Sequence, residues 1–205
     1  IRKKKSTTTE ILKREGVQHL PCYPTTSIIE AAAAAGIRPI VCRQERVGVG
    51  IADGFSRVSN GRPPGVFAMQ NGPGAENAFG GIAQAFADSV PILLLPGGHG
   101  GTRVDVHPNF EAVKHYGGVT KWMAKINMVA RIPELMGMAF SQLRHGRPGP
   151  VMLELPGDVQ HQEFPDGAFN YKPVRPFKSI ADPDDVRDLV KAMLGAEYPI
   201  INAGQ

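Results

Sequence analysis

One acidic side chain, Glu45, stands where the sequence predicts a catalytic group. It follows an apolar run at residues 37–41 that predicts a short buried strand. It precedes a helix whose inner positions include Gly48, Gly50 and Gly54. Since α/β sheets bind ligands at the carboxyl ends of their strands, we expect Glu45 to lie in such a site.

Glycine is unfavourable inside a helix, so its presence at three positions of this helix requires a physical explanation. A glycine inside a helix costs up to ~1 kcal/mol relative to alanine, so several together predict a close approach by another backbone, a helix or a flat ligand. A tightly packed helix beside an ordinary solvated glutamate explains the same residues. The helix alone does not decide between the two interpretations.

Further segments follow in a recognisable order. A strand at residues 65–69 leads into Gln70-Asn71-Gly72-Pro73-Gly74-Ala75-Glu76-Asn77, which opens a helix of small residues that ends near Ser89. The later segments are Ala87-Asp88-Ser89-Val90-Pro91 before a strand at 92–95, Gly146-Arg147-Pro148-Gly149-Pro150-Val151, and Pro156-x-Asp158-Val159-Gln160. Together with the Glu45 segment they make a specific pattern.

In these segments the chain resembles the thiamine diphosphate enzymes of the acetolactate synthase type. The resemblance covers residues 5–165 and concerns the N-terminal pyrimidine-binding domain of that family. It implies an α/β fold, a three-layer α/β/α arrangement with a mostly parallel central sheet. The alternation of strands and helices along the chain favours the same fold.

The resemblance assigns a catalytic role to Glu45. A glutamate at this position in the family hydrogen-bonds N1′ of the aminopyrimidine of thiamine diphosphate and shares its proton, which starts the activation of the thiazolium ring. The resemblance also implies pyrimidine contacts from Pro24, Thr25, Asn71, Pro73 and Asn77. Thr25 stands where the family has a glycine, and a plain strand-to-helix turn explains Pro24 and Thr25 as well.

The substrate side is expected in the glycine-rich loop after residue 95. Counting along the family pattern places His99 on a glutamine, and Phe110 and Glu111 on a later Phe-Gln pair. A histidine and a glutamate offer proton donors that two amides lack, so the acceptor is expected to differ from pyruvate or 2-oxobutyrate. A lone loop histidine is also a common structural residue, and both interpretations of His99 stay open.

The domain boundary is expected at residue 165. Residues 1–165 form the pyrimidine-binding domain, and residues 166–205 form a linker and the beginning of a truncated central domain, in which residues 183–194 predict a helix and residues 198–204 resemble a first strand. The Gly-Asp-Gly motif that holds Mg²⁺ in the family does not occur. We therefore expect no metal ligands here, with the Mg²⁺ site on an absent C-terminal domain or on a separate partner chain. FAD stays open as a second cofactor, because its family site lies mainly in the central domain.

Composition restricts the remaining functions. The chain has 205 residues and a net charge of +4, of which Arg2, Lys3, Lys4 and Lys5 supply four charges, so no nucleic-acid surface is implied. Cys22 and Cys42 show no metal-ligand or disulfide spacing. No apolar run spans a membrane and no signal-type segment begins the chain, which predicts a cytoplasmic protein.

The sequence therefore predicts a thiamine diphosphate enzyme that decarboxylates a 2-oxo acid and joins the product to an acceptor. This chain would carry the pyrimidine-binding part and be inactive alone, and the active unit would be a homodimer or homotetramer. One alternative is a lyase or acetyltransferase that uses the same cofactor. Another is a noncatalytic nucleotide-binding or interaction domain.

Overall fold

A computed structural model describes residues 6–23, 27–165, 169–177 and 179–203. The chain forms two compact units, residues 1–175 and residues 176–205. Each unit is described by itself. The candidate site lies in the first unit.

The first unit is built on a six-stranded parallel sheet with the strand order β2-β1-β3-β4-β6-β5. The strands are β1 (His19–Cys22), β2 (Arg38–Val41), β3 (Gly65–Met69), β4 (Ile92–Gly98), β5 (Trp122–Lys125) and β6 (Val151–Pro156). Because all pairs are parallel, every strand ends at the same edge of the sheet, and the loops that follow them gather there.

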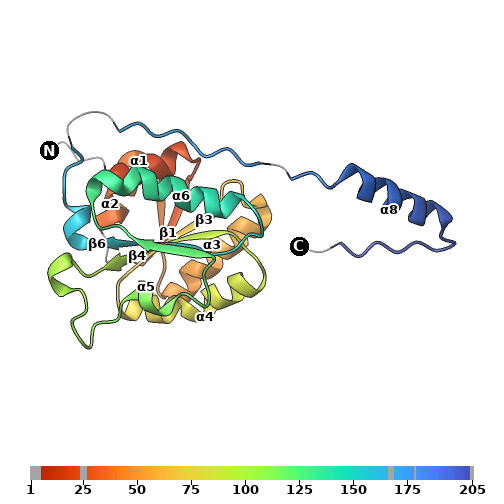
Figure 1. Ribbon diagram of the computed structural model, residues 1–205. Helices are drawn as coiled ribbons and strands as arrows, with labels where there is room; N and C mark the ends of the chain where they lie inside the picture. Colours follow the sequence, from red (N-terminus) through yellow and green to blue (C-terminus); the bar gives the residue numbers. More distant parts are fainter. Residues whose placement is uncertain (1–5, 24–26, 166–168, 178, 204–205) are drawn as a thin grey trace. The chain divides into compact units, whose positions relative to one another are not determined.

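Helices cover both faces of this sheet (Figure 1). One face carries α1 (Thr7–Arg14), α2 (Ser27–Ala35) and α6 (Ile132–Arg144), and the other carries α3 (Glu45–Ser59), α4 (Pro73–Ala87) and α5 (Ala112–His115). A separate hydrophobic core fills each interface, with Leu20 and Phe140 in one and Phe67 and Ile82 in the other. The three-layer α/β/α fold predicted from the sequence is confirmed.

The strand before Glu45 differs from its prediction. Residues 37–41 were predicted to form a buried strand, but β2 is an edge strand whose burial is partial, and Val41 is 61% exposed. An apolar run does not reveal whether a strand has neighbours on both sides. The central strands β3 and β6, in contrast, are buried along their full length.

Residues 156–176 are less linker-like than their prolines and glycines suggest. They contain α7 (Gly157–Gln160), and the described residues 169–175 belong to the first unit, where Phe169, Tyr171 and Val174 pack in its hydrophobic core. The buried Glu15 carboxylate accepts hydrogen bonds from the Tyr171 hydroxyl and, at 3.0 Å, from the Val174 N–H, and Arg144 pairs with it at 2.6 Å. These contacts hold the segment against α1 and α6.

The second unit contains α8 (Pro183–Gly195). Its N-cap is Asp182, whose carboxylate accepts the Asp184 N–H at 2.8 Å. The helix confirms the prediction for residues 183–194. The strand expected at residues 198–204 is wrong for the part described, residues 198–203, which form no strand. A strand needs a neighbour for its backbone hydrogen bonds, and no strand pairing occurs among the described residues of this unit.

Across the described ranges, none of the helices has both the length and the apolar character that a transmembrane span requires.

Candidate active site

Glu45 is a buried carboxylate at the first residue of α3. The chain leaves β2 at Val41, stays extended at the N-cap Gln44 and enters the helix at Glu45, whose side chain is only 4% exposed. A carboxylate in the first turn interacts favourably with the helix dipole and with the free N–H groups of that turn. The protein therefore holds an acid at the carboxyl edge of the sheet with little access to water.

The two carboxylate oxygens of Glu45 have different surroundings. Oε2 accepts a hydrogen bond from Nδ2 of Asn77 at 3.4 Å. Oε1 accepts none from the described residues, and a Cβ added at Gly74 would lie 3.0 Å from it. The absence of a side chain at Gly74 therefore lets the first turn of α4 pass close to this carboxylate, and leaves Oε1 without a hydrogen bond from the described residues.

The turn before α4 brings other predicted residues to the same edge. Gly72, with a φ of 59°, adopts a conformation that favours glycine, and Pro73 is the first residue of the helix. The Asn71 backbone nitrogen passes 3.3 Å from the Cβ position of Gly97, so the ends of β3 and β4 lie close together. Asn71, Pro73 and Asn77 thus share one turn and the helix that it opens, and Asn77 contacts Glu45 directly.

Pro24 and Thr25, the predicted pyrimidine contacts after β1, lie outside the described residues. Only the end of β1 is placed: the Cys42 N–H donates to the Cys22 carbonyl at 2.9 Å. Burial raises the pKa of the Cys22 thiol to about 11. This thiol is therefore protonated at neutral pH.

The predicted substrate residues lie on a loop that closes on itself. His99 is partly exposed directly after β4, and the Phe110 ring stacks on His115 with a centroid distance of 4.5 Å. Glu111 is buried, and its Oε1 accepts the Asp105 N–H at 2.8 Å. This backbone hydrogen bond, together with Lys114, lowers the pKa of Glu111. No described hydrogen bond or ion pair joins His99 to Glu111.

Asp158 contacts the beginning of this loop, and the sequence assigned it no role. Its Oδ2 accepts the Gly101 N–H at 2.8 Å, and a Cβ added at Gly100 would lie 3.0 Å from its Cγ. Its position in the Pro156-x-Asp158-Val159-Gln160 segment was the available signal, but the sequence did not show which loop the carboxylate would hold. Asp158 anchors the beginning of the substrate loop to the end of β6.

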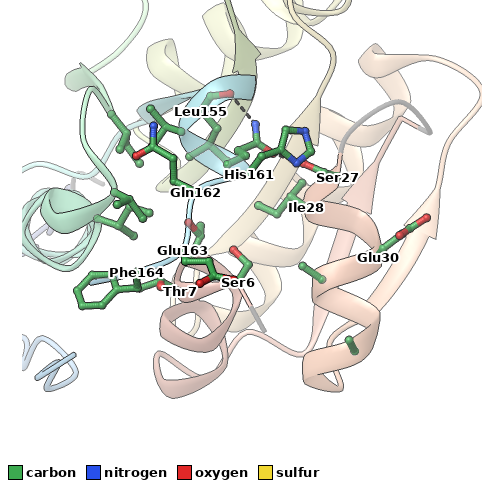
Figure 2. Close-up of a pocket in the computed structure, with 18 residues that line it drawn as sticks. Ser6, Thr7, Ser27, Ile28, Glu30, Leu155, His161, Gln162, Glu163 and Phe164 are labelled. Atoms are coloured by element: carbon green, nitrogen blue, oxygen red, sulfur yellow. Dashed lines mark hydrogen bonds between the residues drawn. The ribbon is translucent and has the colours of Figure 1, made fainter. Parts of the chain in front are cut away.

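A separate cavity of about 630 Å³ lies by the starts of α1 and α2 and the segment after β6. Figure 2 shows labelled polar side chains around it from each of these elements, among them Ser6, Ser27 and His161. Ser27 donates to Gln160 at 2.6 Å, and Gln160 donates to the Leu155 carbonyl at 2.6 Å. Of the predicted site residues that the structure describes, none lines this cavity.

The cavity differs from the Glu45 site in its chemistry. Its two acidic residues, Glu30 and Glu163, are exposed to solvent, whereas Glu45 is enclosed. Acid-base catalysis requires a carboxylate whose environment is controlled, and the Glu45 site meets this condition. Among the described residues, no group of three or more His, Cys, Asp or Glu side chains is arranged to hold a metal ion.

Comparisons with known proteins show the family of the chain. The family model for the thiamine pyrophosphate enzyme, N-terminal TPP binding domain, matches residues 5–117; thiamine pyrophosphate is thiamine diphosphate. A probable acetolactate synthase large subunit of Methanocaldococcus jannaschii is 32% identical over 94% of this chain. The acetolactate synthase large subunit of Lactococcus lactis and the glyoxylate carboligase of Escherichia coli O157:H7 are each 31% identical over 95% of it.

The chain spans 34%, 35% and 34% of the lengths of these three relatives. The match therefore concerns about a third of each relative. With Glu45, Asn77 and the glycine turn at the sheet edge, the sequence and the structure lead to one assignment. The chain belongs to the thiamine pyrophosphate enzymes and carries their N-terminal TPP-binding domain.

Proposed function

We propose that the protein decarboxylates a 2-oxo acid and joins the product to an acceptor, with thiamine diphosphate as cofactor. The observation that carries the proposal is the buried Glu45 carboxylate, whose Oε2 accepts the Asn77 side chain and whose Oε1 accepts no hydrogen bond from the described residues. The acetolactate synthases and the glyoxylate carboligase among the relatives support carboligation. A lyase or acetyltransferase with the same cofactor is the alternative.

Glu45 is proposed to hold and share a proton at N1′ of the aminopyrimidine. Asn77, by donating to Oε2, would fix the carboxylate so that Oε1 meets the ring nitrogen. Asn71, Pro73, Pro24 and Thr25 would complete the pyrimidine contacts. When bound, thiamine diphosphate would supply a nucleophilic carbon that bonds to the substrate and a cationic ring that takes up the electrons released by decarboxylation.

The partners of this chain are also proposed. Mg²⁺ and the cofactor's diphosphate would be held by a C-terminal domain or another chain, with FAD as a possible additional cofactor. The domain boundary at residue 165 and the cytoplasmic location stay predictions. We propose that the acceptor substrate is faced by His99, Phe110 and Glu111. The lowered pKa of Glu111 favours an ionised carboxylate that accepts hydrogen bonds over one that donates a proton.

A homodimer or homotetramer is proposed from the outer surface of α3. Its exposed apolar side chains follow a helical period, with Val47 at 51%, Ile51 at 36% and Phe55 at 38% exposed. Gly50 and Gly54 lie between them with nothing within 4 Å of their Cβ positions. A second subunit packing on this surface, which begins at Glu45, would bring its own groups to the catalytic carboxylate.

The substitution Glu45→Gln in the full-length protein tests the proposal. A glutamine keeps the size and the Asn77 contact but does not share a proton, so we expect turnover at saturating cofactor to fall by about 100-fold or more, as for general acid-base groups. Thermal unfolding should change little. Glu10→Gln, which alters only an exposed pair with Arg14, is the control. Turnover near the wild-type value in Glu45→Gln would refute the assignment.

A further inference from the structure

Lys125 and Glu154 form a charged pair inside the sheet. They are directly opposite each other on β5 and β6, with Nζ of Lys125 at 3.2 Å from Oε1 of Glu154. Glu154 is 1% exposed, both of these atoms are enclosed, and neither makes a hydrogen bond of good geometry. A buried pair of this kind is often no more stabilising than apolar side chains of the same size, so stability alone does not explain it.

The Glu154 carboxylate contacts two points of the chain that are far apart in sequence. Its Oε2 accepts the Val113 N–H at 3.4 Å, in the first turn of α5. Its Oε1 lies against Gly98, where an added Cβ would come within 2.5 Å of it. Gly98 ends β4 and Val113 is the second residue of α5, and the substrate loop at residues 99–111 lies between these two points.

A second set of charges continues this contact into the loop. Glu111 accepts the Asp105 N–H at 2.8 Å, and Lys114 of α5 pairs with Asp105 and, at 3.4 Å, with Glu111. The hydrogen bond from Lys114 lowers the pKa of Asp105, and the charge of Lys125 adds a smaller effect in the same direction. The Glu154 carboxylate therefore lies against the residue before the loop and accepts a hydrogen bond from the helix after it, and the outer charges connect the middle of the loop to α5.

We infer that Lys125 and Glu154 are positioning residues for the substrate loop, and that they set where His99 and Phe110 stand relative to the acceptor. The inference rests on the proposed function for the identity of the acceptor site. The carboxylate acts through backbone it touches, at the residue before His99 and at the helix that follows Glu111. Removing its charge weakens the hydrogen bond from the Val113 N–H and the pairing with Lys125 together.

Hydrogen exchange and steady-state kinetics on the full-length protein test this. In Glu154→Gln and Lys125→Met we expect amide exchange across residues 99–113 to rise about tenfold or more, the factor for losing a hydrogen bond to a charged group. The KM for the acceptor should rise several-fold while cofactor affinity stays near its wild-type value. Lys125→Arg, which keeps the charge, should restore the wild-type exchange.

Glu15→Gln is the matched control, because Glu15 and Arg144 form a buried pair on the opposite layer. It should lower the unfolding temperature without changing exchange in the loop. Gly98→Ala is a milder probe for the case that the charge variants do not fold, since its Cβ displaces the Glu154 carboxylate; it should raise loop exchange in the same way.

Loop exchange that stays at the wild-type rate in Glu154→Gln, Lys125→Met or Gly98→Ala would overturn the inference. Exchange requires no catalysis, so it separates this inference from the proposed function. If loop exchange is fast in Glu154→Gln and Lys125→Met while Glu45→Gln keeps its turnover, the positioning role stands and the cofactor assignment is refuted. If loop exchange stays slow in those two variants while Glu45→Gln loses turnover, the positioning role is refuted and the cofactor assignment stands.

Discussion

The glycines of α3 are expected to respond to alanine in opposite ways. A Cβ added at Gly48 would lie 2.1 Å from the Phe67 ring, so this glycine is required by packing inside the chain. Gly50 and Gly54 have nothing within 4 Å of their Cβ positions. Contacts within the described chain therefore leave these two glycines unexplained, and a second subunit on the outer surface of α3 would explain them.

The size of the effect follows from two opposing terms. Alanine at Gly50 or Gly54 stabilises an exposed helix by up to ~1 kcal/mol each. If another subunit packs there, each added methyl overfills the interface at a cost of about 1–3 kcal/mol. At a two-fold symmetric interface each substitution is present twice, once on each subunit. By the lower value, the four methyls at a two-fold interface cost about 4 kcal/mol together, so we expect the double variant to raise the subunit dissociation constant by several hundred-fold, since ~1.4 kcal/mol corresponds to tenfold.

Sedimentation analysis of the full-length protein over a range of concentrations measures this constant. Gly137→Ala is the control, because Gly137 lies inside α6 on the other layer, with its Cβ position 3.8 Å from the Tyr171 ring. It should leave subunit association unchanged. A double Gly50→Ala, Gly54→Ala variant that unfolds later and associates as tightly as the wild type would show that no subunit packs on this surface.

Three other outcomes are expected. His99→Gln and Glu111→Gln should change acceptor preference or the pH profile of the full-length protein and leave cofactor affinity nearly intact; equal loss of cofactor binding, measured by titration calorimetry, would contradict their placement. The 205-residue chain alone should bind thiamine diphosphate with Mg²⁺ weakly and have no turnover, because its candidate contacts reach only the aminopyrimidine; submicromolar Mg²⁺-dependent binding by a monomer would refute this. Burial and the Glu15 contact raise the pKa of Tyr171, so its stabilising contribution is complete below the ordinary tyrosine pKa of ~10 and is lost as the pH rises above it. Thermal unfolding of Tyr171→Phe should therefore lose less stability above ~pH 10 than the wild type, whereas the exposed Tyr198→Phe should follow the wild type.

The sequence predicted the elements around Glu45 because local signals agree there. Apolar runs mark β3 and β4, and glycine and proline mark the turns that follow strands. β5 carries no such signal: Trp122-Met123-Ala124-Lys125 has a cation at its end and becomes a strand by pairing with β6. Tertiary contacts decide the structure of β5, so the local sequence does not predict this strand.

The charged pair under the substrate loop shows the same limit at the site. Lys125 and Glu154 lie 29 positions apart in the sequence and become neighbours only through the β5–β6 register. Counting along the family pattern placed Glu111 beside the acceptor, but a count gives position along the chain and no side-chain direction. In the structure that carboxylate holds the Asp105 backbone and Lys114. Whether the loop presents His99 to a substrate therefore depends on the contacts of Glu154 beneath the loop. Gly98→Ala changes those contacts and no side chain of the loop. It therefore tests whether the direction of the His99 side chain matters, as distinct from its position along the chain.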